Sequence, residues 1–137
     1  MPGYAGTSDG AMRAVDTNVL MRLVARDDAK QVAVAETFVK GGAWVSHLAL
    51  AEASWVLSAV YDLDAREIAT AVDMLLKHTD LTLQESEVVA NALERFRKRP
   101  ALGFSDCLML EVARKAGHLP LGTFDRMLGK LEGAEQL

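Results

Sequence analysis

Short apolar segments alternate along this chain with longer segments that have the periodicity of amphipathic helices. Three of the short segments, Ala14-Val15, Trp44-Val45-Ser46 and Leu81-Thr82-Leu83, have the length and apolar character of buried strands. Each is followed by a segment in which apolar side chains recur at helical spacing. No tight hairpin signal joins two strand candidates. The alternation therefore predicts an α/β fold with a mainly parallel central sheet and helices on both faces.

Capping and stop signals predict where the helices begin and end. Asp27-Asp28 can cap a helix that ends at Gly41-Gly42, and Asp64-Ala65-Arg66-Glu67 resembles a capping box. Ser105 is the predicted cap of a later helix, and the four consecutive apolar residues 107–110 predict burial on all of its sides. The other predicted elements are helices at 48–61, 86–98 and 106–115, a strand at 119–121 and a short helix at 126–130.

Length and composition predict one domain in a reducing compartment. The chain has 137 residues, half of them hydrophobic, which suffices for one core over residues 12–137. Residues 1–11, rich in Gly, Ser and Thr, are predicted to form a tail. The single cysteine, Cys107, excludes an intramolecular disulfide. Because no apolar run has the length of a signal peptide or a membrane span, we expect a soluble, cytoplasmic protein without a membrane partner.

The overall charge does not decide the class of partner. The formal net charge of −4, from 19 acidic and 15 basic side chains, at first argues against nucleic acid, because phosphates need cations. If four carboxylates hold metal ions, however, the remaining 15 acids balance the 15 bases. A nucleic-acid substrate therefore stays compatible with the composition.

Four carboxylates differ from the other acidic residues because they have apolar neighbours and lie at strand ends or helix starts. They are Asp16, Glu52, Asp106 and Asp125. Asp16 and Asp125 each follow a predicted strand, and the carboxyl ends of parallel strands meet at one edge of a sheet. We expect these two to be partners across that edge, with Asp106 brought in by the buried helix. Like charges so close repel one another unless a cation lies between them, and oxygen ligands favour Mg²⁺ or Mn²⁺.

Each of these carboxylates also has an ordinary structural explanation. Aspartate is a favoured helix N-cap, and Asp16, Asp106 and Asp125 all stand where a cap would stand. Glu52 can be a solvated helix residue. A zinc site is not indicated, because the three histidines have no ligand spacing among them: His47, His78 and His118.

Four short motifs carry a resemblance to a known family. They are Val15-Asp16-Thr17-Asn18-Val19-Leu20, the segment from Ser46 to Glu52, Phe104-Ser105-Asp106-Cys107-Leu108 and Thr123-Phe124-Asp125-Arg126-Met127-Leu128. In this order and spacing, the chain from about Met12 onwards resembles the PIN-domain ribonucleases, especially the VapC-type toxins of bacterial toxin–antitoxin pairs. The resemblance implies a PIN-like three-layer sandwich with a central sheet of four or five strands.

The resemblance also implies an activity, a cofactor and partners. The activity is hydrolysis of RNA phosphodiester bonds at the four carboxylates, of which all but Glu52 would ligate Mg²⁺ or Mn²⁺. Supporting hydrogen bonds would come from Thr17, Asn18 and Thr123. The implied protein partners are a cognate antitoxin, which covers the acidic groove with a basic side chain, and a second copy of the chain in a homodimer.

Basic residues near the predicted site are candidate RNA contacts. Arg95, Lys98 and Arg99 recur at i, i+3 and i+4, which places them on one side of a helix. They could guide the RNA backbone, but basic residues in a last helical turn also suit the helix dipole. Arg126 is a further candidate contact or only a surface charge. Two aromatic residues can stack on bases but are more simply explained as core: Trp44 and Trp55.

Three other functions fit parts of the same pattern. A PIN-like nuclease for RNA maturation would use the same residues without an antitoxin, and the reading frame upstream would separate the two. A phosphoacceptor or phosphatase domain would use Asp16, but a phosphatase of that kind needs a second aspartate where Asn18 stands. A non-catalytic interaction module could keep the fold, although the presence of all four carboxylates argues against it.

Overall fold

The computed structural model describes residues 12–137, and the predicted tail at residues 1–11 lies outside the described residues. Strands and helices alternate along the described chain. In order, the elements are β1 (Arg13–Ala14), α1 (Thr17–Ala25), α2 (Ala29–Val39), β2 (Ala43–Val45), α3 (His47–Ala59), α4 (Ala65–Lys77), β3 (Leu81–Leu83), α5 (Ser86–Lys98), the 3₁₀ turn η2 (Pro100–Leu102), α6 (Phe104–Ala116), β4 (Leu121–Thr123), the 3₁₀ turn η3 (Leu128–Lys130) and β5 (Ala134–Gln136).

Side-chain caps fix the starts of the first four helices. Asp16, Asp28 and Ser46 each accept a hydrogen bond from the backbone amide three residues on, which satisfies a donor that the helix itself leaves free. Asp64 and Glu67 form the predicted capping box, in which each side chain bonds the other residue's backbone amide. The local sequence therefore sets these helix starts.

All strand pairs among the described residues are parallel, which confirms the α/β prediction. The strands form a three-stranded sheet of order β1-β2-β3 and a separate pair, β4-β5. The predicted single sheet of four or five strands is thus divided into three and two strands. The two residues of β1 are paired with β2, and β4 is paired with the C-terminal β5.

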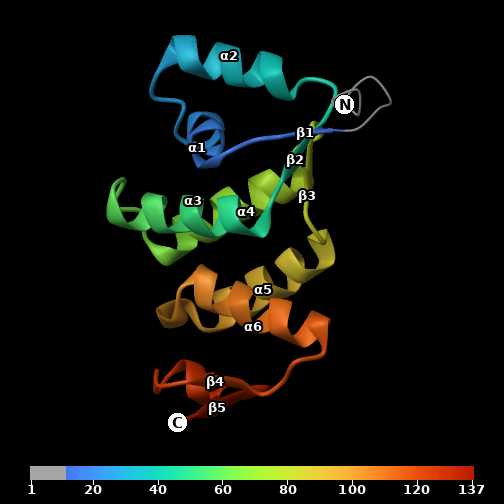
Figure 1. The fold of residues 1–137 in the computed structure, drawn as a ribbon. Helices are drawn as coiled ribbons and strands as arrows, with labels where there is room; N and C mark the ends of the chain where they lie inside the picture. Colours follow the sequence, from blue (N-terminus) through green and yellow to red (C-terminus); the bar gives the residue numbers. More distant parts are fainter. Residues whose placement is uncertain (1–11) are drawn as a thin grey trace.

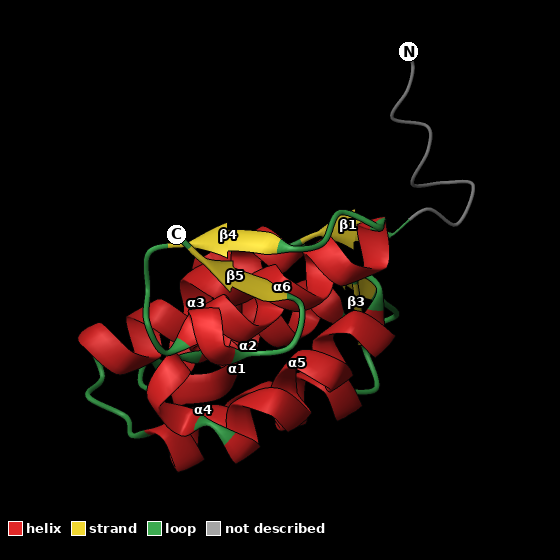
Figure 2. Ribbon diagram, turned by 90° about the horizontal axis from the view of Figure 1, so that it is seen from below, coloured by secondary structure: helices red, strands yellow, loops and turns green. Residues whose placement is uncertain are grey.

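The two sheets lie apart in the molecule. In Figure 1, β1 to β3 lie in the upper half, α5 and α6 lie below them, and β4 and β5 lie at the bottom. Figure 2, which shows the protein from that lower end, has β4 and β5 side by side in front of the helices. The chain therefore passes from the three-stranded sheet through α5 and α6 before it reaches β4.

One continuous hydrophobic core joins the helices to both sheets, and it corrects two predictions. Among the fully buried side chains are Leu20 of α1, Leu57 of α3 and Leu110 of α6. Met109 is 55% exposed, so the prediction of burial on all sides of α6 was wrong. Trp55 is 65% exposed, so its predicted place in the core was also wrong.

A buried carboxylate joins α5 to α6. Glu111 of α6 is only 5% exposed, and its two oxygens contact Arg95 Nε at 3.0 Å and Arg114 Nε at 3.4 Å. Arg114 also donates to the backbone oxygen of Glu132 at 2.8 Å, close to the start of β5. The helical layer and the two-stranded sheet are thus held together by one charged cluster.

The start of α6 differs from its prediction. The helix begins at Phe104 with Gly103 as its N-cap, so Ser105 lies inside the first turn and caps nothing. Gly103 has φ 82° and ψ 145°, a backbone conformation that only glycine adopts without strain. The glycine turns the chain from η2 directly into the helix, and Asp106 follows in its first turn.

No helix among residues 12–137 combines the length and the apolar character that crossing a bilayer requires.

Candidate active site

Asp16, Thr17 and Glu52 connect the start of α1 to α3. Asp16 Oδ1 accepts a hydrogen bond from the amide of Val19 at 3.1 Å, so this carboxylate is indeed a helix cap. The hydroxyl of the next residue, Thr17 Oγ1, donates to Glu52 Oε1 at 2.7 Å. Both carboxylates are exposed. The predicted residues Asp16 and Glu52 therefore lie on neighbouring elements, joined through the predicted support Thr17.

Asp125 is held by the turn after β4. Its Oδ1 accepts hydrogen bonds from the amides of Met127 and Leu128, both at 2.8 Å, and its own amide donates to Thr123 Oγ1 at 3.0 Å. Thr123, which the sequence predicted as a support, therefore fixes the backbone that carries Asp125. Asp125 is not the cap of η3, whose N-cap is Met127, but its carboxylate closes the turn that leads into η3.

Asp106 lies partly buried in the first turn of α6. Partial burial in the first turn of α6 raises the pKa of Asp106 above its ordinary value of 3.8, and the nearby negative charge of Asp125 raises it further. Asp106 makes no cap. Because their charges interact, Asp106 and Asp125 lie near each other and form a second pair.

The four carboxylates are thus arranged as two pairs. Asp16 and Glu52 lie near the three-stranded sheet, while Asp125 follows β4 in the two-stranded one. The prediction that Asp16 and Asp125 are partners across one sheet edge is wrong, because β4 pairs with β5 and not with β1. Among residues 12–137, no three acidic, histidine or cysteine side chains lie close enough together to hold one ion.

The chemistry of these donors nevertheless suits a hard divalent cation. Carboxylate oxygens are the ligands that Mg²⁺ prefers, and none of the ion pairs in the described part of the chain involves any of the four carboxylates. Burial and, after it, the negative charge of Asp125 raise the pKa of Asp106, so its ionised form is disfavoured here. The oxygen chemistry of these donors therefore suits Mg²⁺ or Mn²⁺, but the structure of residues 12–137 does not bring three of them around one ion.

Cys107 follows Asp106 but offers no reactive thiolate. The thiol is fully buried, and burial followed by the charge of Asp106 raises its pKa to about 11. The thiol thus stays protonated at neutral pH, and neither nucleophilic nor metal-binding chemistry is expected of it.

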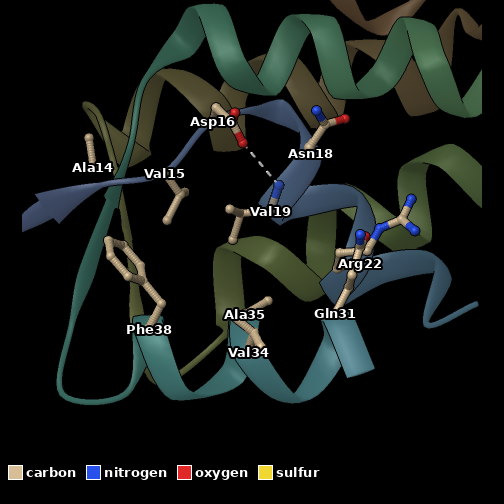
Figure 3. A pocket seen from close by; sticks show the side chains of 10 residues that line it. All are labelled: Ala14, Val15, Asp16, Asn18, Val19, Arg22, Gln31, Val34, Ala35 and Phe38. Carbon is tan, nitrogen blue, oxygen red and sulfur yellow. Dashed lines mark hydrogen bonds between the residues drawn. The ribbon is translucent and has the colours of Figure 1, made fainter. Parts of the chain in front are cut away.

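A groove of about 570 Å³ opens between α1 and α2, with Asp16 at one end (Figure 3). Its walls are mostly apolar, and the figure shows Val19 and Phe38 facing into it from the two helices. The predicted residue Asn18 lies beside Asp16 on the rim, and Arg22 lies farther along α1. The groove therefore offers an apolar surface that leads to one of the carboxylates.

The predicted RNA-binding cations do not form one surface. Arg95 is partly buried and bonded to Glu111, so it is not available to a ligand. Lys98 and Arg99 are exposed, as is Arg126. Two other exposed arginines, Arg66 and Arg97, which are not among the predicted contacts, line one depression. No sequence signal links this last pair, because the two lie on different helices and come together only in the fold.

Comparison with known proteins identifies the family. The model of the PIN domain matches residues 13–134, nearly the whole chain and all four carboxylates. No curated protein and no solved structure matches the chain significantly. PIN domains form a family of nucleases that generally use divalent metals. The alternating parallel strands and helices, the acidic residues at their ends and the extent of the match together assign this chain to the PIN domain family.

Proposed function

We propose that this protein is a metal-dependent endoribonuclease that hydrolyses RNA phosphodiester bonds. The observation that supports the proposal best is the set of four carboxylates on four different elements, none of which is paired with a cation within residues 12–137. Two of the four, Asp106 and Asp125, are close enough for their negative charges to interact. Such uncompensated charge is typical of sites that bind a cation.

In this proposal Asp16, Asp106 and Asp125 would hold Mg²⁺ or Mn²⁺, which requires the two pairs of carboxylates to approach each other more closely than they do in this structure. A bound ion of this kind makes a coordinated water more acidic and neutralises charge on the phosphate. Glu52 orients the attacking water with its free carboxylate oxygen, because its other oxygen is fixed by the hydroxyl of Thr17.

The remaining predicted residues act by positioning. Thr123 fixes the backbone of Asp125, and the exposed amide of Asn18 donates a hydrogen bond to a phosphate oxygen of the bound RNA. Lys98, Arg99 and Arg126 contribute positive charge for the RNA backbone.

The experiment that tests the proposal is an RNA cleavage assay with the purified protein. We expect cleavage with Mg²⁺ or Mn²⁺ and none in excess EDTA. Asp16→Asn should abolish cleavage, while Asp28→Asn should leave it unchanged. The second variant is the matched control, because Asp28 caps α2 with a bond of the same 3.1 Å length that Asp16 makes at α1. Cleavage that persists in EDTA would contradict the metal-dependent mechanism.

The more specific role that we propose is that of a toxin held inactive by an antitoxin. The apolar groove of Figure 3 supports this role, because an amphipathic segment laid along Val19 and Phe38 would end beside Asp16. A basic side chain of that segment could pair with the carboxylate and displace a metal ion. We also propose a homodimer as the state in the cell.

An RNA-maturation nuclease without an antitoxin is the rival role, and the two make different predictions. A toxin stops growth when it is expressed alone, and growth returns when the product of the neighbouring reading frame is co-expressed. A maturation enzyme has no such neighbour. Mapping of RNA ends after expression would identify the cleaved RNA in either case.

A further inference from the structure

Trp55 is a large aromatic side chain on the open surface of α3. It is 65% exposed, although burial of a tryptophan is strongly favourable. It follows Glu52 by three residues, so the two side chains lie on the same side of the helix, one turn apart. An exposed aromatic residue beside a candidate catalytic carboxylate is typical of a binding surface.

Trp55 lines a cleft that reaches the start of α6, the helix that carries Asp106. The cleft has a volume of about 430 Å³ and lies between α3, the start of α4 and the connection from α5 to α6. Ser105, which directly precedes Asp106, lines its other wall. The cleft therefore adjoins the two helices that carry Glu52 and Asp106, and its volume falls in the range of pockets that bind small ligands.

A basic depression continues this cleft on the side away from Ser105. It has a volume of about 590 Å³ and shares Asp64, Phe96 and Pro100 with the cleft. Arg66 and Arg97 line it, and both are exposed and absent from the ion pairs of the described residues. The one carboxylate that they face there, Asp64, is engaged in capping α4. Two unpaired guanidinium groups thus lie next to the aromatic cleft.

We propose that this aromatic and basic surface binds the RNA strand next to the cleaved bond. Trp55 stacks on one base in the cleft, and Arg66 and Arg97 bind the phosphates of the adjoining nucleotides. This inference rests on the proposed endoribonuclease function and extends it, since it assigns the course of the substrate away from the carboxylates.

The combination of groups favours single-stranded RNA over other occupants. Every base has a flat face that stacks on an aromatic ring, and guanidinium groups bind phosphate oxygens in pairs. A duplex keeps its bases stacked inside, so only an unpaired base can enter the cleft. An apolar partner helix would leave both arginines without acceptors.

The test measures binding separately from cleavage. A short, fluorescently labelled single-stranded RNA is titrated with the Asp16→Asn protein, which leaves the RNA intact, and binding is followed by anisotropy. In that background Trp55→Ala should weaken binding about tenfold, while Trp55→Phe should retain most of it. Tryptophan fluorescence should be quenched by RNA, and the quenching should disappear in Trp55→Phe, which keeps only Trp44.

Matched controls use residues of similar exposure away from the cleft. Val60→Ala removes an apolar side chain that is 68% exposed at the end of α3, and it should not change binding. Arg66→Ala and Arg97→Ala should each lower the slope of log affinity against log salt concentration by about 0.7. Lys30→Ala, which removes an exposed cation on α2, should leave the slope unchanged.

The outcomes separate this inference from the function on which it rests. If the unmodified protein cleaves RNA but Trp55→Ala binds RNA as tightly as its parent, the cleft does not bind the substrate. If Trp55→Ala instead converts a dimer to a monomer in sedimentation, the surface is a contact between copies of the chain, and the inference is overturned. Absence of metal-dependent cleavage by the unmodified protein contradicts the proposed function itself.

Discussion

Asp106 carries a charge that the folded protein disfavours. Its pKa is raised first by burial and then by Asp125, so folding favours the protonated acid. At pH values between the pKa of Asp106 in the unfolded chain and its higher pKa in the folded protein, the unfolded chain binds fewer protons than the folded one. The free energy of unfolding therefore falls as the pH rises through the raised pKa. At neutral pH the ionised carboxylate destabilises the metal-free protein.

Replacing this charge should stabilise the metal-free protein. We expect Asp106→Asn to raise the melting temperature in EDTA at neutral pH, and the gain should shrink as the pH falls and Asp106 becomes protonated. Thermal unfolding over a pH series measures both effects. Asp73→Asn is the control, because it removes only the charge that pairs with Lys77 on the surface of α4, and it should give no gain. An Asp106→Asn protein that melts below its parent in EDTA would contradict the electrostatic account.

The hydroxyl of Thr17 should contribute to activity and little to stability. Thr17→Val removes the bond that fixes Glu52, and a supporting contact of this kind is worth about tenfold or more in activity. We therefore expect the cleavage rate to fall about tenfold without a comparable loss in melting temperature. Thr37→Val provides the comparison, because the hydroxyl of Thr37 bonds only the carbonyl of Ala33 within its own helix. Equal rates for the two variants would show that Thr17 has no part in positioning.

At the scale of elements, the charged cluster between α5 and α6 should be the most sensitive contact. Glu111→Ala leaves Arg95 partly buried without its acceptor and leaves Arg114 with only the carbonyl of Glu132, and we expect a loss of about 3 kcal/mol in the free energy of unfolding. Glu87→Ala breaks an exposed pair with Lys115 and should cost about 0.5 kcal/mol or less. Urea denaturation measures the free energy of unfolding of both variants. Similar losses in the two would show that burial of the charged cluster adds nothing to its contribution to stability.

The elements that the sequence predicted well are those with strong local signals. The helix at 86–98 and the strand at 81–83 have the predicted bounds, and the capping box of α4 is present, because apolar spacing and side-chain caps act within a few residues. The strand predicted at 119–121 lies at Leu121–Thr123 and is β4. Its residues are not fully buried, so no clear alternation of apolar and polar residues marks where it begins and ends. β5 was not located by the sequence, since its residues Ala134–Gln136 have no strand pattern.

For the site, the sequence could supply the chemistry but not the arrangement. Their positions at strand ends and helix starts selected Asp16, Glu52, Asp106 and Asp125, the family resemblance agreed with that choice, and the fold couples them within each pair. The division of the four carboxylates into two pairs depends on which strand pairs with β4. Pairing between strands that are far apart in the sequence cannot be recognised from the residues of either strand. Exposure of Trp55 was likewise unforeseen, because helical periodicity does not show which flank of a helix stays uncovered.

At the scale of the whole molecule, metal binding should reveal whether the two carboxylate pairs act as one centre. Mg²⁺ that binds only the folded protein stabilises it, by roughly 2.7 kcal/mol at a hundred times its Kd. If one centre uses ligands from both pairs, Asp16→Asn and Asp125→Asn should each abolish the Mg²⁺-induced rise in melting temperature. Two separate weak sites would instead leave part of the rise in each variant, which would refute a single shared centre.

The close packing at the C-terminal strand has a practical consequence for handling the protein. The amide of Leu137 donates to the carbonyl of Thr123 at 2.8 Å, and Gly129 lies so near Gln136 that a Cβ on the glycine would approach Gln136 Cβ to 2.7 Å. A tag joined directly after Leu137 would lie next to the backbone that orients Asp125. Assays of the same protein before and after removal of a cleavable tag at that position would measure its effect on the activity.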